Sequence, residues 1–174
     1  AIADACAAAD DDPQIRCILL RAEGRAFCAG ADFRGRSGGG AEQVYAQAAR
    51  IFARRKPIVA AVQGPAVGGG LGLALAADFR VAAPEARFQA NFVRIGLHPG
   101  FALTHTLPRL VGAQRAGELL LTGRSVDGAE AVGIGLADRL ATTGTLDEAA
   151  AAFAAEIAAG APLALRSIRD VLTD

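Results

Sequence analysis

The sequence has no excess of charge of either sign. Its 174 residues carry 18 Lys and Arg against 18 Asp and Glu, so the formal net charge at pH 7 is 0. Proteins that bind nucleic acid usually carry a basic face, whereas the arginines here are scattered along the chain. No uninterrupted apolar run reaches the length of about 18 residues that a membrane-spanning helix requires. We therefore expect neither a nucleic-acid partner nor a membrane span.

Cysteine is also scarce. The three cysteines are Cys6, Cys17 and Cys28, and they show neither a CxxC pair nor the Cys/His spacing of a metal site. Three thiols cannot all pair with one another. We expect free, buried or half-buried thiols in a reducing cytoplasm, and no bound metal.

The two ends of the sequence lack the usual signals. The chain does not begin with Met, and Ala1–Ala9 lacks the basic start of a signal peptide. The last residues, "LRSIRDVLTD", follow a helical pattern with no terminating glycine. We expect further sequence before and after this stretch.

Apolar segments with the lengths of strands alternate with segments that have helical patterns. This alternation predicts an α/β fold with buried, mostly parallel strands. The predicted strands are Ile15–Arg21, Pro57–Gln63, Phe79–Ala82, Arg87–Gln89 and Ala137–Leu140. The predicted helices are Ala1–Ala9, Ala41–Arg54, Gly69–Ala77, Phe101–Leu110, Gln114–Leu121, Ala129–Val132, Leu146–Ala159 and Pro162–Leu172. In Ala41–Arg54, Val44, Ala48 and Ile51 share the expected buried face.

Three consecutive glycines begin the helix in "GPAVGGGLGLALAADFRV", residues 64–81. Glycine in a helix costs about 1 kcal/mol relative to alanine, so its use here indicates a close approach to bare backbone. A dinucleotide fingerprint that starts at Gly68 fails because its sixth position is Leu73 and not glycine. A phosphate loop fails because the only lysine is the distant Lys56. Close helix packing and an oxyanion hole, formed by free N–H groups at the helix start, both remain open.

A second loop, "RAFCAGADF" at residues 25–33, follows the first strand as the glycines follow the second. Together with "KPIVAAVQGPAVGGGLGLALAADFRVAAPEARF", "IGLHPGFALTHTLPRLVG", "AGELLLTGRSVDGAEAVGIGLADRL" and "APLALRSIRDVL", it resembles the crotonase, or enoyl-CoA hydratase/isomerase, family over nearly the whole chain. The resemblance implies a spiral of repeated ββα units with C-terminal helices. It also implies a role in fatty acid metabolism, a homotrimer or dimer of trimers, and coenzyme A as part of the thioester substrate rather than as a tightly bound cofactor.

The same resemblance assigns roles to particular positions. The two oxyanion donors fall on the backbone N–H groups of Ala31 and Gly69. The coenzyme would contact Phe27, Cys28, Ala29 and Gly68, while Arg25 would bind a phosphate or remain a solvated surface residue. The family pattern divides the chain into a core at residues 1–140 and a C-terminal helical trimerisation part at residues 141–174.

The sequence departs from the family at the acid/base positions. The two glutamates of family hydratases correspond to Gly72 and Phe92, and the aspartate of one isomerase branch corresponds to Gly100. His98 is the remaining candidate base, since a neutral imidazole can accept a proton at cytoplasmic pH; a locally hydrogen-bonded turn histidine is the alternative. Three functions stay open: an enoyl-CoA hydratase/isomerase-type enzyme with a relocated base, a non-catalytic acyl-CoA-binding protein, and a CoA-thioester hydrolase, decarboxylase or carbon–carbon lyase.

Overall fold

The computed structural model describes residues 2–30, 41–142 and 144–173. Its helices are α1 Ile2–Asp11, α2 Ala41–Phe52, α3 Gly69–Ala76, α4 Leu103–Val111, α5 Ala113–Thr122, α6 Gly128–Gly133, α7 Leu146–Ala158, α8 Pro162–Thr173 and the 3-10 helix η1 Asn91–Ile95. Its strands are β1 Ile18–Leu20, β2 Ile58–Val62, β3 Pro65–Val67, β4 Phe79–Ala82, β5 Arg87–Gln89, β6 Ser125–Asp127 and β7 Arg139–Leu140. The predicted α/β class is confirmed, and β4 and β5 have the predicted bounds.

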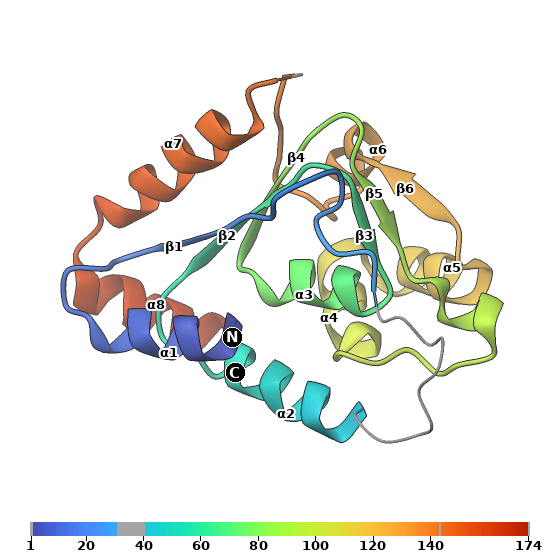
Figure 1. Cartoon of the computed structure of the whole chain (residues 1–174), viewed down its shortest axis with the longest axis horizontal. Helices are drawn as coiled ribbons and strands as arrows, with labels where there is room; N and C mark the ends of the chain where they lie inside the picture. The colour runs from blue at the N-terminus through green and yellow to red at the C-terminus, as the bar shows by residue number, and fades with distance from the viewer. Residues whose placement is uncertain (1, 31–40, 143, 174) are drawn as a thin grey trace.

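The described strands form two sheets (Figure 1). One sheet has the order β1-β2-β4-β7 with parallel pairs throughout, and the other has the order β3-β5-β6. Consecutive strands such as β2 and β3, or β4 and β5, therefore go to different sheets before the chain continues into helices. This is the repeated ββα arrangement that the resemblance implied, with mostly parallel pairing as predicted. Among the described strands, β5 and β6 are the one antiparallel pair.

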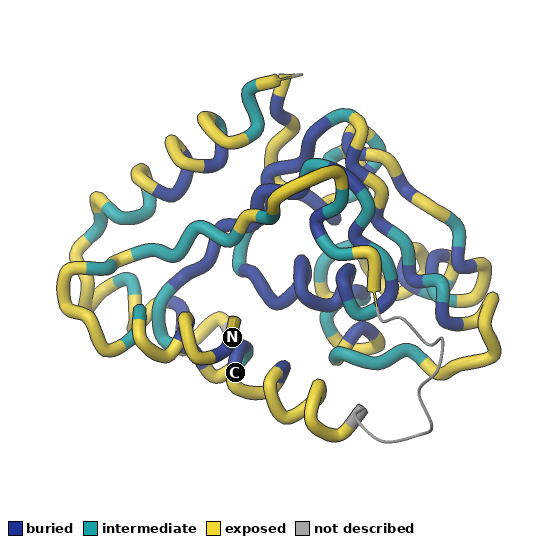
Figure 2. The backbone as a smooth tube through the Cα atoms, in the orientation of Figure 1, coloured by how far each residue is buried: buried dark blue, intermediate teal, exposed yellow. Residues whose placement is uncertain are grey.

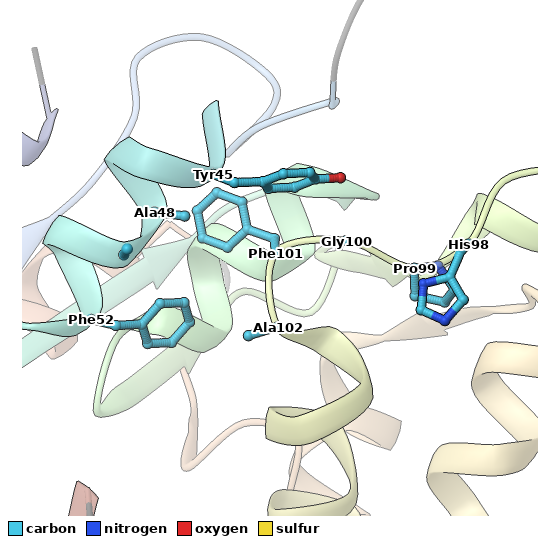
Figure 3. A pocket seen from close by; sticks show the side chains of 9 residues that line it. Tyr45, Ala48, Phe52, His98, Pro99, Gly100, Phe101 and Ala102 are labelled. Carbon is cyan, nitrogen blue, oxygen red and sulfur yellow. The ribbon is translucent and has the colours of Figure 1, made fainter. Parts of the chain in front are cut away.

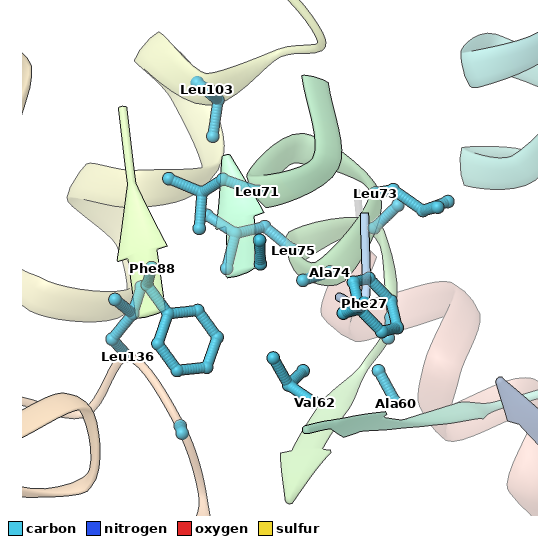
Figure 4. Packing of buried hydrophobic residues seen from close by; sticks show 14 of the residues in the cluster. Phe27, Ala60, Val62, Leu71, Leu73, Ala74, Leu75, Phe88, Leu103 and Leu136 are labelled. Carbon is cyan, nitrogen blue, oxygen red and sulfur yellow. The ribbon is translucent and has the colours of Figure 1, made fainter. Parts of the chain in front are cut away.

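The side chains of β2 divide between two apolar clusters because successive residues of a strand point to opposite faces. Ile58, Ala60 and Val62 pack with α3 in the larger cluster, whose centre is shown in Figure 4. Val59 and Ala61 pack on the other face, against the Phe153 side of α7. Helix α7 thus covers the outer face of the four-stranded sheet, and α3 is buried between the sheets (Figure 2).

Two sequence predictions about burial are corrected here. The strand in Ile15–Arg21 was expected to be buried, but β1 is half-buried because it is an edge strand with one neighbour, β2. Val44 was expected on the buried face of α2 and is 47% exposed, whereas Ala48 and Ile51 are buried as predicted. Val44 lies near the start of α2, before the part of the helix that reaches the core.

A buried ion-pair cluster holds the last helix to the body of the protein. Asp78, directly after α3, accepts hydrogen bonds from the N–H of Ile58 (2.7 Å) and from Nη2 of Arg54 (2.5 Å). On its other oxygen it accepts a bond of 3.1 Å from Nε of Arg169 in α8. Arg169 also donates to the carbonyl oxygen of Arg54. Arg54 and Arg169 are 3% and 8% exposed, so the charges lie in the interior and depend on one another.

All three cysteines are free, as predicted, with Cys6 buried and the other two half-buried. Burial raises the pKa of the Cys17 thiol to about 11. The part of the chain that the structure describes contains no cluster of His, Cys, Asp and Glu that could hold a metal ion. Among the described helices, none alone has the length and apolar character to cross a membrane; α7 and α8 reach these criteria only as a pair, which is bent by 104°.

Candidate active site at the start of helix α3

The four glycines at the start of α3 have different structural environments. Gly68 is the N-cap residue and has φ +57° and ψ −118°, a conformation that side chains disfavour. Its N–H donates to the carbonyl oxygen of Gln89 (2.9 Å). A Cβ at Gly70 would lie 2.7 Å from the carbonyl carbon and 2.8 Å from Cβ of Cys28, and nearer still to the carbonyl oxygen. The backbone conformation therefore requires glycine at 68, and packing against Cys28 requires glycine at 70.

Gly72 is required by packing as well. A Cβ there would lie 2.6 Å from Cγ and 2.8 Å from Cδ1 of Phe101, with Cβ of Phe101 nearer still. Close packing, one of the two alternatives that the sequence left open for the glycines, explains Gly70, which lies against Cys28, and Gly72, which lies against Phe101.

Gly69 is different from its neighbours. A Cβ at this residue would meet no described atom within 4 Å. Gly69 is the first residue of α3, where backbone N–H groups have no partner inside the helix. None of the hydrogen bonds found between described residues uses the Gly69 N–H as donor. This N–H, with the helix dipole behind it, can donate a hydrogen bond to a negatively polarised oxygen.

Three segments surround the start of α3. Cys28 is fixed there by two hydrogen bonds of 3.0 Å to β3, one from its N–H to Pro65 and one to its carbonyl from the N–H of Val67. Asn91 and Phe92 lie on the side of Gly68, at 3.0 Å and 3.8 Å from a Cβ built there. The 100–102 segment lies over Gly72. These contacts come from residues far apart in sequence and enclose one end of the helix.

The predicted coenzyme contacts divide by exposure. Phe27 is buried, with its side chain in the larger apolar cluster, and Cys28 is half-buried with its backbone bonded to β3. Ala29 and Arg25 are exposed. The second predicted oxyanion donor, Ala31, lies outside the described residues.

His98 lines an apolar pocket of about 500 Å³. The pocket lies between α2 and the turn before α4, and is lined by Tyr45, Ala48, Ala49, Phe52, His98, Pro99, Gly100, Phe101 and Ala102 (Figure 3). His98 is exposed and lies at the far end of the turn from Phe52 and Phe101. The Tyr45 ring packs against Gly100: its Cε1 would lie 2.9 Å from a Cβ built on that glycine.

The sequence did not identify two of these contributors, Phe101 and Phe52. Phe101 was assigned to a helix, but it precedes α4 and has φ +55°, followed by Ala102 with φ +56°. A helical start at Phe101 was therefore wrong, because these two residues adopt left-handed conformations. The neighbouring "PG" was the only local sign of a turn.

Comparisons with known proteins agree with this architecture. The family model for enoyl-CoA hydratase/isomerase matches residues 1–174. This chain belongs to the enoyl-CoA hydratase/isomerase family. A Thermus thermophilus protein that carries an enoyl-CoA hydratase name is 43% identical over 171 residues, which are 92% of this chain and 67% of the relative. The enoyl-CoA isomerase/hydratase fer4 of Mycosarcoma maydis is 39% identical over 168 residues, 91% of this chain and 61% of fer4.

Solved structures of family members have the same fold. An enoyl-CoA hydratase subunit from Geobacillus kaustophilus matches with a TM-score of 0.89 and 35% identity, over 98% of this chain and 70% of that one. DspI from Pseudomonas aeruginosa matches with a TM-score of 0.91 and 30% identity, over 98% of this chain and 68% of DspI. The chain spans 61 to 67% of the length of the first three curated relatives that it matches. The crotonase-type fold implied by the sequence is confirmed, and the chain is a member of an acyl-CoA-binding enzyme family.

Proposed function

We propose that this protein binds an acyl-CoA thioester at the start of α3 and stabilises the thioester enolate with the backbone N–H groups of Gly69 and Ala31. The observation that carries the proposal is the Gly69 N–H, which lies at the start of a buried helix and has no described partner. A Cβ built on the same residue would meet no described atom within 4 Å. A thioester carbonyl gains negative charge when a proton leaves its α-carbon or when a nucleophile adds to a conjugated double bond. Preset donors stabilise that charge, and losing one costs about 2.7–4 kcal/mol in comparable sites.

The chemistry we propose is of the enoyl-CoA hydratase/isomerase type, with slow or absent hydration of crotonyl-CoA. Hydration requires one group to activate water and one to handle the α-proton. Neither Gly72 nor the buried Phe92 can do either, and the aromatic ring at 92 lowers the polarity near Gly68. Binding of acyl-CoA without turnover is the second candidate function, and it is favoured by the same two residues.

We propose His98 as the base in any turnover that occurs. Its exposure and its place in the pocket lining allow it to exchange protons with solvent. His98→Ala should remove most of the activity that the unmodified protein shows, because the variant lacks the proton acceptor. Initial rates of the two proteins with crotonyl-CoA and with a 3-enoyl-CoA test this assignment. Activity that is unchanged in His98→Ala would contradict it.

The donor role of Gly69 is tested by comparing two substitutions at one position. Gly69→Pro removes the N–H, and proline is tolerated at the first residue of a helix. Gly69→Ala adds a Cβ but keeps the N–H, so it is the matched control. We expect turnover, or thioester affinity if turnover is absent, to fall at least tenfold further in Gly69→Pro than in Gly69→Ala. Equal effects in two folded variants would contradict the oxyanion role.

Self-association through α8 is also proposed. Ile168, Val171 and Leu172 share a face of this helix by their spacing and are 58%, 74% and 73% exposed. Leu163, at the start of the helix, is 81% exposed. An apolar face of this kind indicates an interface, and a trimer or a dimer of trimers would cover it. Residues 141–174 would then act as the assembly part of the chain.

A further inference from the structure

The turn before α4 holds two side-chain-bearing residues in the left-handed region. Phe101 and Ala102 have φ +55° and φ +56°, and among the described residues they are the only non-glycine residues with positive φ. Residues with a Cβ disfavour this conformation, and it persists where surrounding contacts impose it. In this protein those contacts hold the Phe101 ring in one place.

The ring of Phe101 lies between two helices. On one side it contacts Phe52 of α2, with ring centroids 6.1 Å apart and planes tilted by 57°. Toward α3, Cβ, Cγ and Cδ1 of Phe101 fill the position that a side chain at Gly72 would occupy. A larger residue at 72 and the Phe101 ring therefore exclude each other.

Phe101 also forms a wall of the apolar pocket. Figure 3 shows its ring among Tyr45, Ala48 and Phe52, in the part of the pocket away from His98. Phe101 lines the pocket, no residue of α3 is among the lining residues, and Cβ, Cγ and Cδ1 of Phe101 lie against Gly72 of α3. The pocket therefore ends at Phe101 rather than at α3, and shortening this side chain would extend the pocket toward Gly72.

We propose that Phe101 is a specificity-determining residue, which limits the length of the apolar group that the pocket admits. The identity of that group as the acyl chain of a CoA thioester rests on the proposed function. The limit itself rests only on the packing of Phe101 against Gly72 and Phe52.

The packing is tested by a double-mutant cycle. Gly72→Ala should lower the melting temperature because its Cβ would overlap Phe101. Phe101→Gly removes the obstacle and suits the positive φ, so Gly72→Ala should cost much less in that background. Additive effects of the two substitutions would overturn the packing argument.

The length limit is tested with straight-chain alcohols from butanol to dodecanol and with the matching saturated acyl-CoA thioesters. Binding is measured by calorimetry to the unmodified protein, Phe101→Gly and Phe101→Leu. The control is Phe153→Leu, a buried phenylalanine on α7 on the other face of the sheet. In the unmodified protein and in the control, alcohol affinity should stop rising at the same chain length.

In Phe101→Gly the limit should move to longer alcohols, with affinity rising about fourfold for each further methylene that is buried. Phe101→Leu should move the chain-length limit by a smaller amount. If Phe101→Gly does not fold, the result with Phe101→Leu tests the proposal. An unchanged limit in the folded variants would overturn the proposal. A shifted alcohol limit without thioester binding would support the role of Phe101 and refute the proposed function, because alcohols do not require an oxyanion hole.

Discussion

Gly70 and Gly69 are adjacent glycines in α3, yet alanine should affect them in opposite ways. At Gly70 a Cβ would lie 2.7 Å from the carbonyl carbon of Cys28, a distance that real Cβ atoms do not show. Neither partner can yield easily, because the obstacle is backbone that is bonded to β3 on both sides. At Gly69 no described atom lies within 4 Å of the new Cβ.

The size of the Gly70→Ala effect follows from three contributions. Overpacking of a filled interior costs about 1–3 kcal/mol. Displacing the Cys28 carbonyl weakens its 3.0 Å hydrogen bond from the Val67 N–H, which costs about 1 kcal/mol. Alanine is favoured over glycine in a helix by about 1 kcal/mol, which offsets the lost hydrogen bond. The net expectation is destabilisation by about 1–3 kcal/mol for Gly70→Ala, against no loss or a gain of up to about 1 kcal/mol for Gly69→Ala.

Urea unfolding followed by circular dichroism, at one protein concentration, measures both variants against the unmodified protein. Gly70→Ala should lower the midpoint without a large change in slope, and Gly69→Ala should not lower it. If Gly70→Ala is as stable as the unmodified protein, the close approach of Cys28 to α3 is wrong. If Gly69→Ala is as damaging as Gly70→Ala, the space over Gly69 is filled by the protein itself, and the proposed thioester position loses its support.

Three further outcomes are expected. Arg169→Leu should destabilise the protein by about 3 kcal/mol in urea unfolding because it removes one of the two arginine partners of the half-buried Asp78. The exposed Arg166→Leu on the same helix should change stability by less than about 0.5 kcal/mol, and equal effects of the two substitutions would contradict the cluster. If α8 mediates assembly, Leu172→Glu should lower the molar mass measured by light scattering toward that of the monomer. A monomeric unmodified protein would contradict this role of α8. The pKa of the Cys17 thiol, which burial raises to about 11, should make alkylation of Cys17 at pH 8 at least tenfold slower in the folded protein than in urea. Peptide mass mapping measures both rates, and equal rates would contradict the burial of Cys17.

The longer elements could be predicted from the sequence because their own patterns define them. β2 is a run of five buried residues, and α3 is preceded by glycines and followed by Asp78. The short elements β3, β6 and η1 were missed. β3, with three residues beginning at Pro65, gains its hydrogen bonds from β5 and from Cys28, not from a local pattern. Such elements depend on partners that become neighbours only in the folded chain.

The candidate site was predictable to a similar extent. The glycines indicated a close approach to α3, and the family resemblance pointed to Gly69 and His98. The identity of what approaches Gly72 could not be predicted, since Phe101 is 29 positions further along and its left-handed backbone has no strong sequence signal. Burial of Val44 was wrongly expected because periodicity gives the face of a helix but not how far the core extends along it.

The absence of a carboxylate at residue 72 is linked to the packing of Phe101 and is not a matter of residue 72 alone. A glutamate side chain at 72 would have to pass through the space that Phe101 fills, so it could not be accommodated while Phe101 keeps its position. Phe101 in turn is held by Phe52 and by a turn with two consecutive left-handed residues. The second position, Phe92, is also buried and lies against Gly68. An aromatic side chain thus excludes a glutamate at 72 and replaces one at 92. In the proposed function, the base must therefore be another residue, and His98 in the pocket lining is our candidate.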